Sequence, residues 1–226
     1  MGPFATGRRE TRSRSPPSVE SVPPARGTAV LHSLVPKHCC RYGGPMTTLR
    51  TATLEDVPTL AEIHIAASRA AYRGLVPDER LDRLDARRSQ ERVRSVLAGG
   101  DAETFAIERE GEPAGSVTLG RCRDGALDPD ATGEIYGIYL SPDRWRQGLG
   151  TLAFHEAERL LRKRGARIAV LWTFEANRAA RRSYKAIGYV LDGGTRTIDV
   201  GVPLPIVRYR KRLTADEHPI DGLPTR

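Results

Sequence analysis

Apolar and polar residues follow two periodicities along the chain, one typical of helices and one typical of strands. From Leu149 to Leu161 apolar residues recur at helical spacing with charged residues between them, and Gly165 offers a C-terminal cap. Residues 133–140 (GEIYGIYL) and 166–174 (ARIAVLWTF) are rich in β-branched and aromatic residues, and the second run is nearly continuous in apolar character. The pattern therefore predicts a strand, a long helix and a strand that is covered on both faces.

The rest of the chain from Met46 onward also alternates between helix and strand signals. Leu54-Glu55-Asp56 supplies a helix start. Glu110-Gly111-Glu112 separates two strand-like runs, so it indicates a hairpin. The remaining predicted elements are a strand from Leu49, a helix over residues 81–97, a hairpin of 104–109 with 113–119, a helix over 177–187, a strand over 189–191 and a closing edge strand over 206–213. The predicted order is β-α-α-β-β-β-α-β-α-β-β.

Length and composition limit the possible classes of protein. The chain has 226 residues, 39% of them hydrophobic and 28% charged, which fits one globular domain with a tail. The formal net charge is +8, but residues 1–45 hold seven Lys or Arg against two Asp or Glu and so contribute +5 of it. Because this basic excess lies mostly outside the expected domain, a nucleic-acid-binding surface on the domain is weakly supported.

The first 45 residues are rich in Pro, Arg and Ser and show no helical or strand period, which predicts a disordered segment. We expect a domain over residues 46–213 and a short tail over 214–226. Met46 as the functional start is the alternative to a native N-terminal extension. Cys39 and Cys40 are adjacent and Cys122 is alone, so no disulfide framework and no metal-ligand spacing is present. We predict no metal, no membrane span and a cytoplasmic location.

A turn with two glycines separates the strand that ends at Leu140 from the helix that starts near Leu149. Gly148 and Gly150 leave backbone N–H groups uncovered in the first helical turn, where these donors have no partner inside the helix. The helix dipole and the nearby Arg144 and Arg146 favour an anion at this point. Neither the Walker pattern nor the third glycine of the dinucleotide fingerprint is present, so a cofactor held by its diphosphate is the chemistry that fits. Close helix packing is the alternative reason for the glycine pair.

The sequence resembles the GCN5-related N-acetyltransferase (GNAT) superfamily in three stretches. They are Gly133 to Thr151, Trp172-Thr-Phe-Glu-Ala-Asn177 and Ser183-Tyr184-Lys-Ala-Ile-Gly188-Tyr189. The resemblance covers roughly Met46 to Leu213. It implies a mixed, mostly antiparallel α/β (α+β) sheet of about six to seven strands with about four helices. The family pattern Gln/Arg-x-x-Gly-x-Gly/Ala is matched at Gly148 and Gly150, whereas Trp145 stands at its first position.

The resemblance also implies acetyl-CoA as co-substrate and assigns residues to it. Backbone amides of the glycine turn would hold the pyrophosphate, and the end of the central strand would pair with the pantetheine. The cofactor-binding residues carried over are Ile138, Tyr139, Leu140, Arg146, Gln147, Gly148, Leu149, Gly150, Thr151 and Asn177.

Tyr184 and Glu134 are the candidate catalytic residues. Tyr184 follows Asn177 by seven residues, so both project from one helix face, and a phenol can give a proton to a departing thiolate. Glu134 lies eleven residues before Trp145, the offset of the glutamate base in histone-type members. If Glu134 points into an apolar cleft, desolvation raises its pKa. The alternative role for Tyr184 is structural, with its ring packing the helix against the sheet. The alternative for Glu134 is a solvent-exposed position at the start of the strand. A water relay is the alternative to Glu134 as the base.

The predicted function is transfer of an acetyl group from acetyl-CoA to a primary amine of a small molecule or a protein. An acyl-CoA-binding sensor without turnover is the alternative, and nucleic-acid binding through the basic tail is a third, less supported one. Asp78, Asp82 and Asp85 near the cleft mouth would suit a cationic amine, a lysine or a protein N-terminus. A homodimer through the C-terminal strands is possible, and the identity of the acceptor is left open.

Overall fold

The computed structural model describes residues 38–40 and 46–214. The predicted disordered segment and the predicted tail lie outside this range, apart from Thr214 and the short strand His38–Cys40. The strands are β1 (His38–Cys40), β2 (Thr47–Thr51), β3 (Ala102–Arg109), β4 (Glu112–Arg121), β5 (Thr132–Leu140), β6 (Ile168–Phe174), β7 (Val190–Asp199) and β8 (Pro203–Arg212). The helices are the 3-10 turns η1 (Leu54–Asp56) and η2 (Pro142–Arg144) and the α-helices α1 (Val57–Tyr72), α2 (Asp78–Asp82), α3 (Ala86–Ala98), α4 (Leu149–Lys163) and α5 (Arg178–Ala186).

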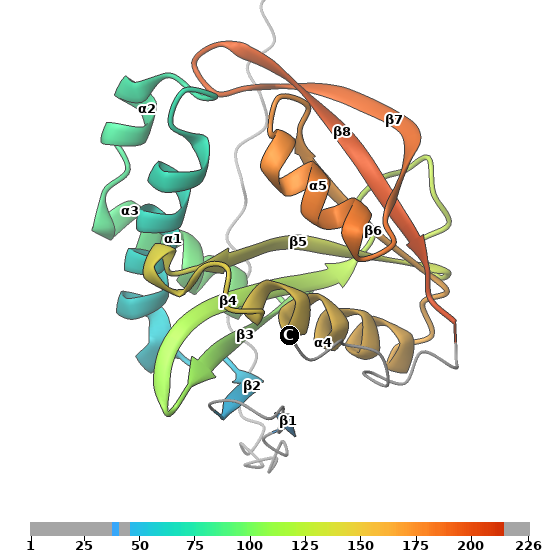
Figure 1. Ribbon diagram of the computed structural model, residues 1–226, viewed down its shortest axis with the longest axis horizontal. Helices are drawn as coiled ribbons and strands as arrows, with labels where there is room; N and C mark the ends of the chain where they lie inside the picture. Colours follow the sequence, from blue (N-terminus) through green and yellow to red (C-terminus); the bar gives the residue numbers. More distant parts are fainter. Residues whose placement is uncertain (1–37, 41–45, 215–226) are drawn as a thin grey trace, which may run out of the picture. The chain divides into compact units, whose positions relative to one another are not determined.

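In the described part of the chain, the eight strands form one sheet in the order β1-β2-β3-β4-β5-β6-β8-β7 (Figure 1). All neighbouring strands run antiparallel except β5 and β6. This mixed α/β arrangement confirms the predicted fold class, with one more strand and one more helix than expected. The predicted hairpin between β3 and β4 is also confirmed. Its turn residues Glu110 and Gly111 both have positive φ, which is typical of a two-residue hairpin turn.

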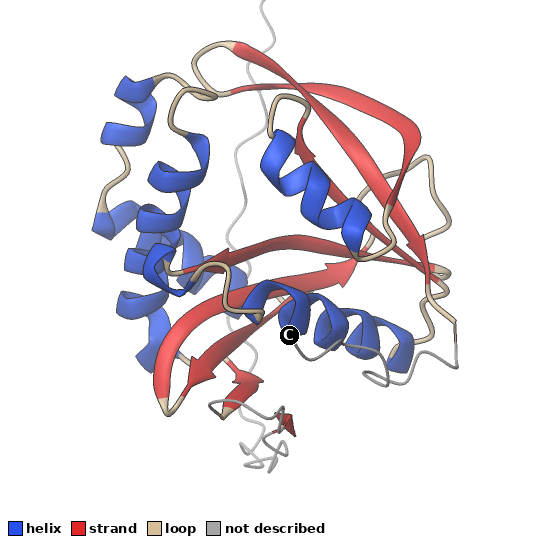
Figure 2. Ribbon diagram, viewed as in Figure 1, coloured by secondary structure: helices blue, strands red, loops and turns tan. Residues whose placement is uncertain are grey.

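Helices cover the sheet on two faces, as Figure 2 shows. One face packs against α4 and α5 and holds the main core, which includes Val117, Leu119 and Ile135 from β4 and β5. The other face is covered by α1 and α3, whose contacts are with β3, β4 and β5. Its side chains are more polar and include Ser116 and Thr118. The large apolar face thus stabilises the sheet, and the other face leaves polar side chains at a cavity beneath α1 and α3.

A β-bulge in β5 creates the opening between the two central strands. The register with β4 shifts so that Leu119 pairs with Ile135 while Thr118 pairs with Gly137, which leaves Tyr136 as the additional residue. β5 pairs with β6 only over residues 132–134 and 168–170. The strands then diverge, and the later residues of β5 do not pair with β6. Bulges bend a strand, so this one accounts for the divergence.

Two predicted elements differ from the structure. The helix predicted over residues 81–97 is two helices, because Asp85 adopts an extended conformation and its carboxylate caps α3 by accepting from the Arg88 amide (2.9 Å). The strand predicted over residues 189–191 extends to Asp199. Its glycines suggest a turn, but Gly194 lies inside the strand, where a Cβ would be 2.7 Å from Arg208 Nε.

The prediction that residues 206–213 form the edge strand is wrong, because β8 lies between β6 and β7 and β7 is the edge. The basic residues of β8 do not all face outward. Arg208 is 9% exposed and forms ion pairs with Asp124 and with Asp192 (2.9 Å). Lys211 pairs with Glu158 (3.0 Å). These buried charges are tolerated because each has a partner, and a partner on a distant segment leaves no local sequence signal.

Candidate active site

The turn before α4 has the geometry of an anion-binding cradle. Arg146 (φ 60°) and Gly148 (φ 81°) both adopt left-handed backbone conformations, which cost a non-glycine residue roughly 1–3 kcal/mol. Such successive conformations direct neighbouring N–H groups toward one point. Within the described residues, the first amide of this region with a backbone acceptor is that of Leu152, which donates to the Gly148 carbonyl (3.1 Å). The amides of residues 146–151 are therefore available to a ligand.

Gly150 leaves space above these amides. A Cβ added at Gly150 would meet only Leu140 Cδ1, at 3.7 Å, which is ordinary contact. Protein packing therefore does not require glycine at this position, whereas close approach of a ligand to the backbone does. Together with the positive end of the α4 dipole, the cradle fits a diphosphate.

Trp145 replaces the polar first residue of the family pattern and has a structural role. Its indole N–H donates to the Leu140 carbonyl (2.8 Å), and Gln147 Nε2 donates to the Asp143 carbonyl (3.0 Å). The Trp145 bond holds the turn against the end of β5, and the Gln147 bond fixes the turn to η2. The departure from the pattern thus stabilises the cradle and leaves its amides free.

A cleft of about 820 Å³ runs from the cradle along β5 to α5. Ile138, Tyr139 and Leu140 line one side of it, and Trp172 from β6 lies on the other. Of the predicted cofactor residues, the structure brings Arg146, Gly148, Gly150, Thr151 and Asn177 to the same cleft. The side chain of Leu149 does not line the cleft, because Leu149 is 3% exposed and packs in the core. Only its main-chain amide belongs to the cradle. Gln147 does not line the cleft.

Tyr184 lies on α5 at the inner end of this cleft. Its ring makes edge-to-face contacts with Phe154 and Tyr209, each at 5.6 Å between centroids. Burial raises the pKa of the Tyr184 phenol to about 12, although a hydrogen bond with Thr173 acts in the opposite direction. The phenol therefore keeps its proton at neutral pH. Both predicted features, packing and access to the cleft, are present in this one residue.

Some polar side chains at α5 stabilise the fold, and others line the cleft. Asn177 Oδ1 accepts from the Ala180 amide (3.1 Å), so this side chain caps α5. Arg181 donates to Tyr209 Oη (3.1 Å) and to the Glu175 carbonyl (2.7 Å), and is committed to the fold. Arg182 lines the cleft.

Glu134 is buried but is not among the residues that line the cleft. It is 1% exposed, and Arg123 encloses its carboxylate: the Arg123 amide donates to Oε2 (2.9 Å) and the guanidinium to Oε1 (2.7 Å). Arg123 also stacks over the Tyr136 ring, 3.7 Å from its centroid. The carboxylate therefore has an ion pair as its immediate environment, and its role as a base stays a prediction.

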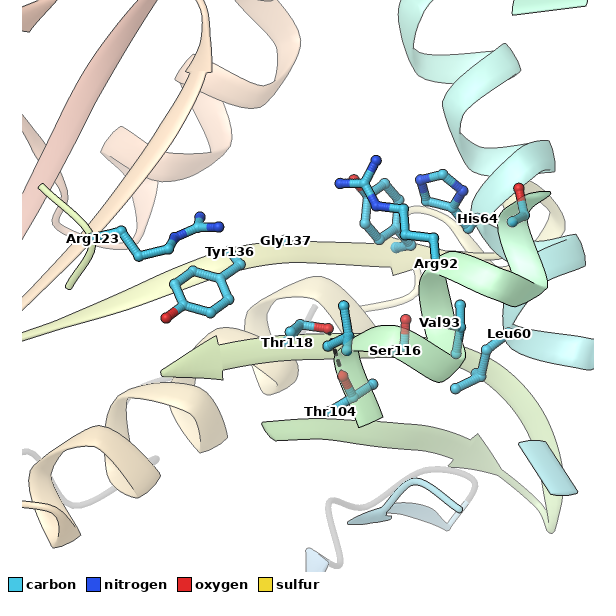
Figure 3. A pocket seen from close by; sticks show the side chains of 13 residues that line it. Leu60, His64, Arg92, Val93, Thr104, Ser116, Thr118, Arg123, Tyr136 and Gly137 are labelled. Carbon is cyan, nitrogen blue, oxygen red and sulfur yellow. Dashed lines mark hydrogen bonds between the residues drawn. The ribbon is translucent and has the colours of Figure 1, made fainter. Parts of the chain in front are cut away.

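A second, smaller cavity of about 120 Å³ lies on the other face of β5, beneath α1 and α3 (Figure 3). Tyr136, Gly137 and Tyr139 line both this cavity and the cleft. The bulge residue and its neighbours are thus the boundary between the two spaces. Thr104 and Thr118 form its floor, with their hydroxyls 3.0 Å apart.

His64 of α1 stands at this boundary and was not predicted from the sequence. Its ring contacts Tyr139 edge-to-face, with 4.5 Å between centroids. Burial and, to a smaller extent, the charge of Arg92 lower the pKa of His64 to about 4, so the imidazole is neutral at pH 7. A polar residue between apolar neighbours of a helix was the available signal, but which cavity it lines depends on how α1 packs.

The three aspartates proposed for a cationic acceptor are engaged elsewhere. Arg73 pairs with Asp78 (3.3 Å) and Asp82 (3.4 Å). Asp85 caps α3 and pairs with Arg88 (3.5 Å). None of them is an unpaired carboxylate at the cleft. Among the described residues, no group of three or more His, Cys, Asp or Glu could hold a metal ion.

A sheet that opens at a bulge beside a turn of free amides has a geometry suited to a cofactor that carries a diphosphate. The family described as "Acetyltransferase (GNAT) family" matches residues 62–189 of this chain. The chain therefore belongs to the GNAT family and is an acetyltransferase.

Individual relatives agree with this assignment. The uncharacterized N-acetyltransferase YuaI of Bacillus subtilis (strain 168) is 29% identical over 132 residues, which cover 58% of this chain and 74% of that protein. The PaiA N-acetyltransferase of Thermoplasma acidophilum, solved with coenzyme A, is 17% identical with a TM-score of 0.56, over 74% of this chain and 98% of that one. YncA of Salmonella typhimurium, solved with acetyl-CoA, is 19% identical with a TM-score of 0.56, over 78% and 99%. The two solved structures share the fold.

Proposed function

We propose that this chain transfers an acetyl group from acetyl-CoA to a primary amine of a small molecule or a protein. The observation that carries the proposal is the cradle of free amides at residues 146–151, which opens into a cleft that leads to the Tyr184 phenol. Family membership and relatives solved with coenzyme A or acetyl-CoA support the same chemistry. No observation favours a sensor without turnover.

Different groups of the chain would bind different parts of the co-substrate. The amides of Arg146, Gln147, Gly148, Leu149, Gly150 and Thr151 would bind the pyrophosphate. The main chain of Ile138, Tyr139 and Leu140, which does not pair with β6, would bind the pantetheine, and Asn177 would line its path. When bound, acetyl-CoA supplies an acyl group activated as a thioester.

Tyr184 is the proposed general acid. It holds a proton on Oη, and its raised pKa keeps that proton available throughout the neutral range. Glu134 is the proposed base for the incoming amine. Because its carboxylate is bound by Arg123, a proton would have to reach it past that ion pair or through water.

The decisive experiment adds a negative charge to the cradle through Gly150→Asp. The new Cβ has room, and an acidic residue in the first turn of α4 interacts favourably with the helix dipole, so we expect an unchanged or slightly raised Tm. Calorimetric titration should show affinity for coenzyme A reduced about tenfold or more, because the carboxylate repels the diphosphate. Gly150→Asn is the control of equal size without charge.

Two results would contradict the proposed function. One is an absence of binding heat when wild-type protein is titrated with coenzyme A and acetyl-CoA. The other is equal binding by the Asp and Asn variants, which would mean that no anion lies near Gly150. Release of free thiol from acetyl-CoA in the presence of an amine mixture is the accompanying activity measurement.

Three further proposals concern the domain bounds, the cellular location and the oligomeric state. We propose residues 46–213 as the acetyltransferase domain and a cytoplasmic location, since Cys122 is a free buried cysteine. Among the described helices, none combines the length and apolar character needed to cross a bilayer. A homodimer through β7 and β8 stays a prediction, as does the minor role expected for nucleic acid.

A further inference from the structure

The acceptor side of the molecule has two neighbouring cavities. The small cavity beneath α1 and α3 adjoins an outer one of about 700 Å³, which is bounded by α2, α3 and the turn between β7 and β8. His64, Ser89 and Arg92 line both cavities. Arg92 therefore lies between the outer cavity and Tyr139, which lines both the small cavity and the cleft.

The walls of the inner cavity contain cationic groups and no carboxylate. Arg92 and Arg123 line it, and neither Asp nor Glu does. Arg123 is neutralised by Glu134 and is held over Tyr136. Among the described residues, Arg92 has neither an ion pair nor a hydrogen bond, and its charge is close enough to influence the pKa values of His64 and Tyr139. Figure 3 shows Arg92 beside His64 at one end of the cavity and Arg123 with Tyr136 at the other.

The outer cavity has the same sign of charge. Its lining includes Arg80, Arg83, Arg88 and Arg92 against Glu79 and Asp85, an excess of two positive charges. The Asp85 carboxylate is already paired with Arg88. A path lined in this way raises the local concentration of anions and disfavours cations.

We propose that the acceptor is a small amine that also carries an anionic oxygen group, a carboxylate or a phosphate, and that Arg92 binds this group. The inference rests on the proposed acetyl transfer and adds the substrate class. A guanidinium offers paired N–H donors that match carboxylate and phosphate oxygens. Its positive charge also favours the neutral form of a nearby amine over the ammonium form, and the neutral form is the nucleophile.

The experiment uses matched acceptors that differ in one group. Amino acids are compared with their carboxamides, and O-phosphoethanolamine with ethanolamine, on the full-length wild-type protein and on Arg92→Gln. Thiol release gives kcat/KM, and calorimetry with coenzyme A present gives equilibrium binding. We expect the wild type to prefer the anionic member of a pair, and Arg92→Gln to reduce kcat/KM for that member about 10- to 100-fold, the effect of losing one hydrogen bond to a charged group. Values for the neutral member should change less than about twofold.

Arg94→Gln is the matched control, because Arg94 lies on the same helix, bonds only to Gln90 (3.2 Å) and lines neither cavity. It should leave the preference unchanged. Comparing the amino-acid pairs with the phosphate pair shows whether Arg92 binds a carboxylate or a phosphate. Arg92→Glu sharpens the test, since it should shift preference toward diamines.

The outcomes separate the inference from the proposed function. Turnover or binding without preference for anionic members, or an equal loss for both members in Arg92→Gln, overturns the inference and leaves acetyl transfer standing. If calorimetry shows an anion preference that Arg92→Gln abolishes while no acceptor releases thiol, Arg92 binds the anionic group of an amine ligand and the proposed turnover is wrong. If neither measurement shows an anion preference for any pair, Arg92 does not select the acceptor.

Discussion

The two sides of β5 bind by different means. The proposed co-substrate side is made largely from main chain: the amides of the cradle and the part of β5 that does not pair with β6. The acceptor side is made from side chains of α1, α3, β4 and β5 that are far apart in sequence. Main-chain sites require glycines and a helix start at fixed spacing, so a short motif reveals them. Side-chain sites require only that distant segments pack together, and a short motif cannot show this.

Tyr184→Phe gives the largest expected effect and tests the co-substrate side. It removes the phenolic proton and keeps the ring that packs on Phe154. We expect kcat to fall about 10²–10⁴-fold, the usual contribution of a general acid, with little change in coenzyme A affinity. Tyr209→Phe is the control, because it removes a neighbouring hydroxyl that bonds Arg181 and does not line the cleft. Equal losses in both variants would indicate that Tyr184 acts through packing alone.

The pair Arg123 and Glu134 tests whether a side-chain group on the acceptor face is structural or catalytic. Arg123→Ala leaves a carboxylate that is 1% exposed without its cation, so we expect a loss of about 3 kcal/mol in the free energy of unfolding at pH 7. Glu134→Gln leaves Arg123, whose side chain is 61% exposed, and should cost about 1 kcal/mol. Denaturant unfolding of both variants measures this order.

Activity of the same two variants then decides the role of Glu134. If Glu134 is the base, Glu134→Gln lowers kcat far more than its effect on stability suggests, and the pH dependence of kcat loses its acidic limb. If kcat is unchanged, the carboxylate only anchors Arg123 beside Tyr136.

His64→Gln tests the electrostatics of the acceptor side. The folded-state pKa of about 4 lies below the ordinary histidine value of 6.5, so the unfolded chain binds the proton more readily. The neutral, buried His64 therefore contributes fully to the free energy of unfolding above pH 6.5, and this contribution is lost as pH falls toward 4. Between pH 7 and pH 5 we expect the wild type to lose about 2 kcal/mol more than the variant in urea unfolding. Parallel losses would show that His64 is not desolvated.

Several parts of this protein follow from local sequence. The hairpin follows from Glu110-Gly111, where glycine adopts positive φ without steric cost, and α4 and its cradle follow from apolar periodicity after Gly148 and Gly150. The spacing of Asn177 and Tyr184 places both at one cleft. These features depend on backbone conformation within a few residues, and amino-acid type decides that directly.

Other parts were decided by tertiary structure. The bulge at Tyr136, the enclosure of Glu134 by Arg123, the position of β8 inside the sheet and the meeting of His64 with Arg92 all join segments distant in the chain. Their energies come from burial and from charges brought close on folding, and these depend on three-dimensional distance. The sequence by itself thus determined the turn of free amides before α4, and only the folded sheet determined which charges line the cavities beneath α1 and α3.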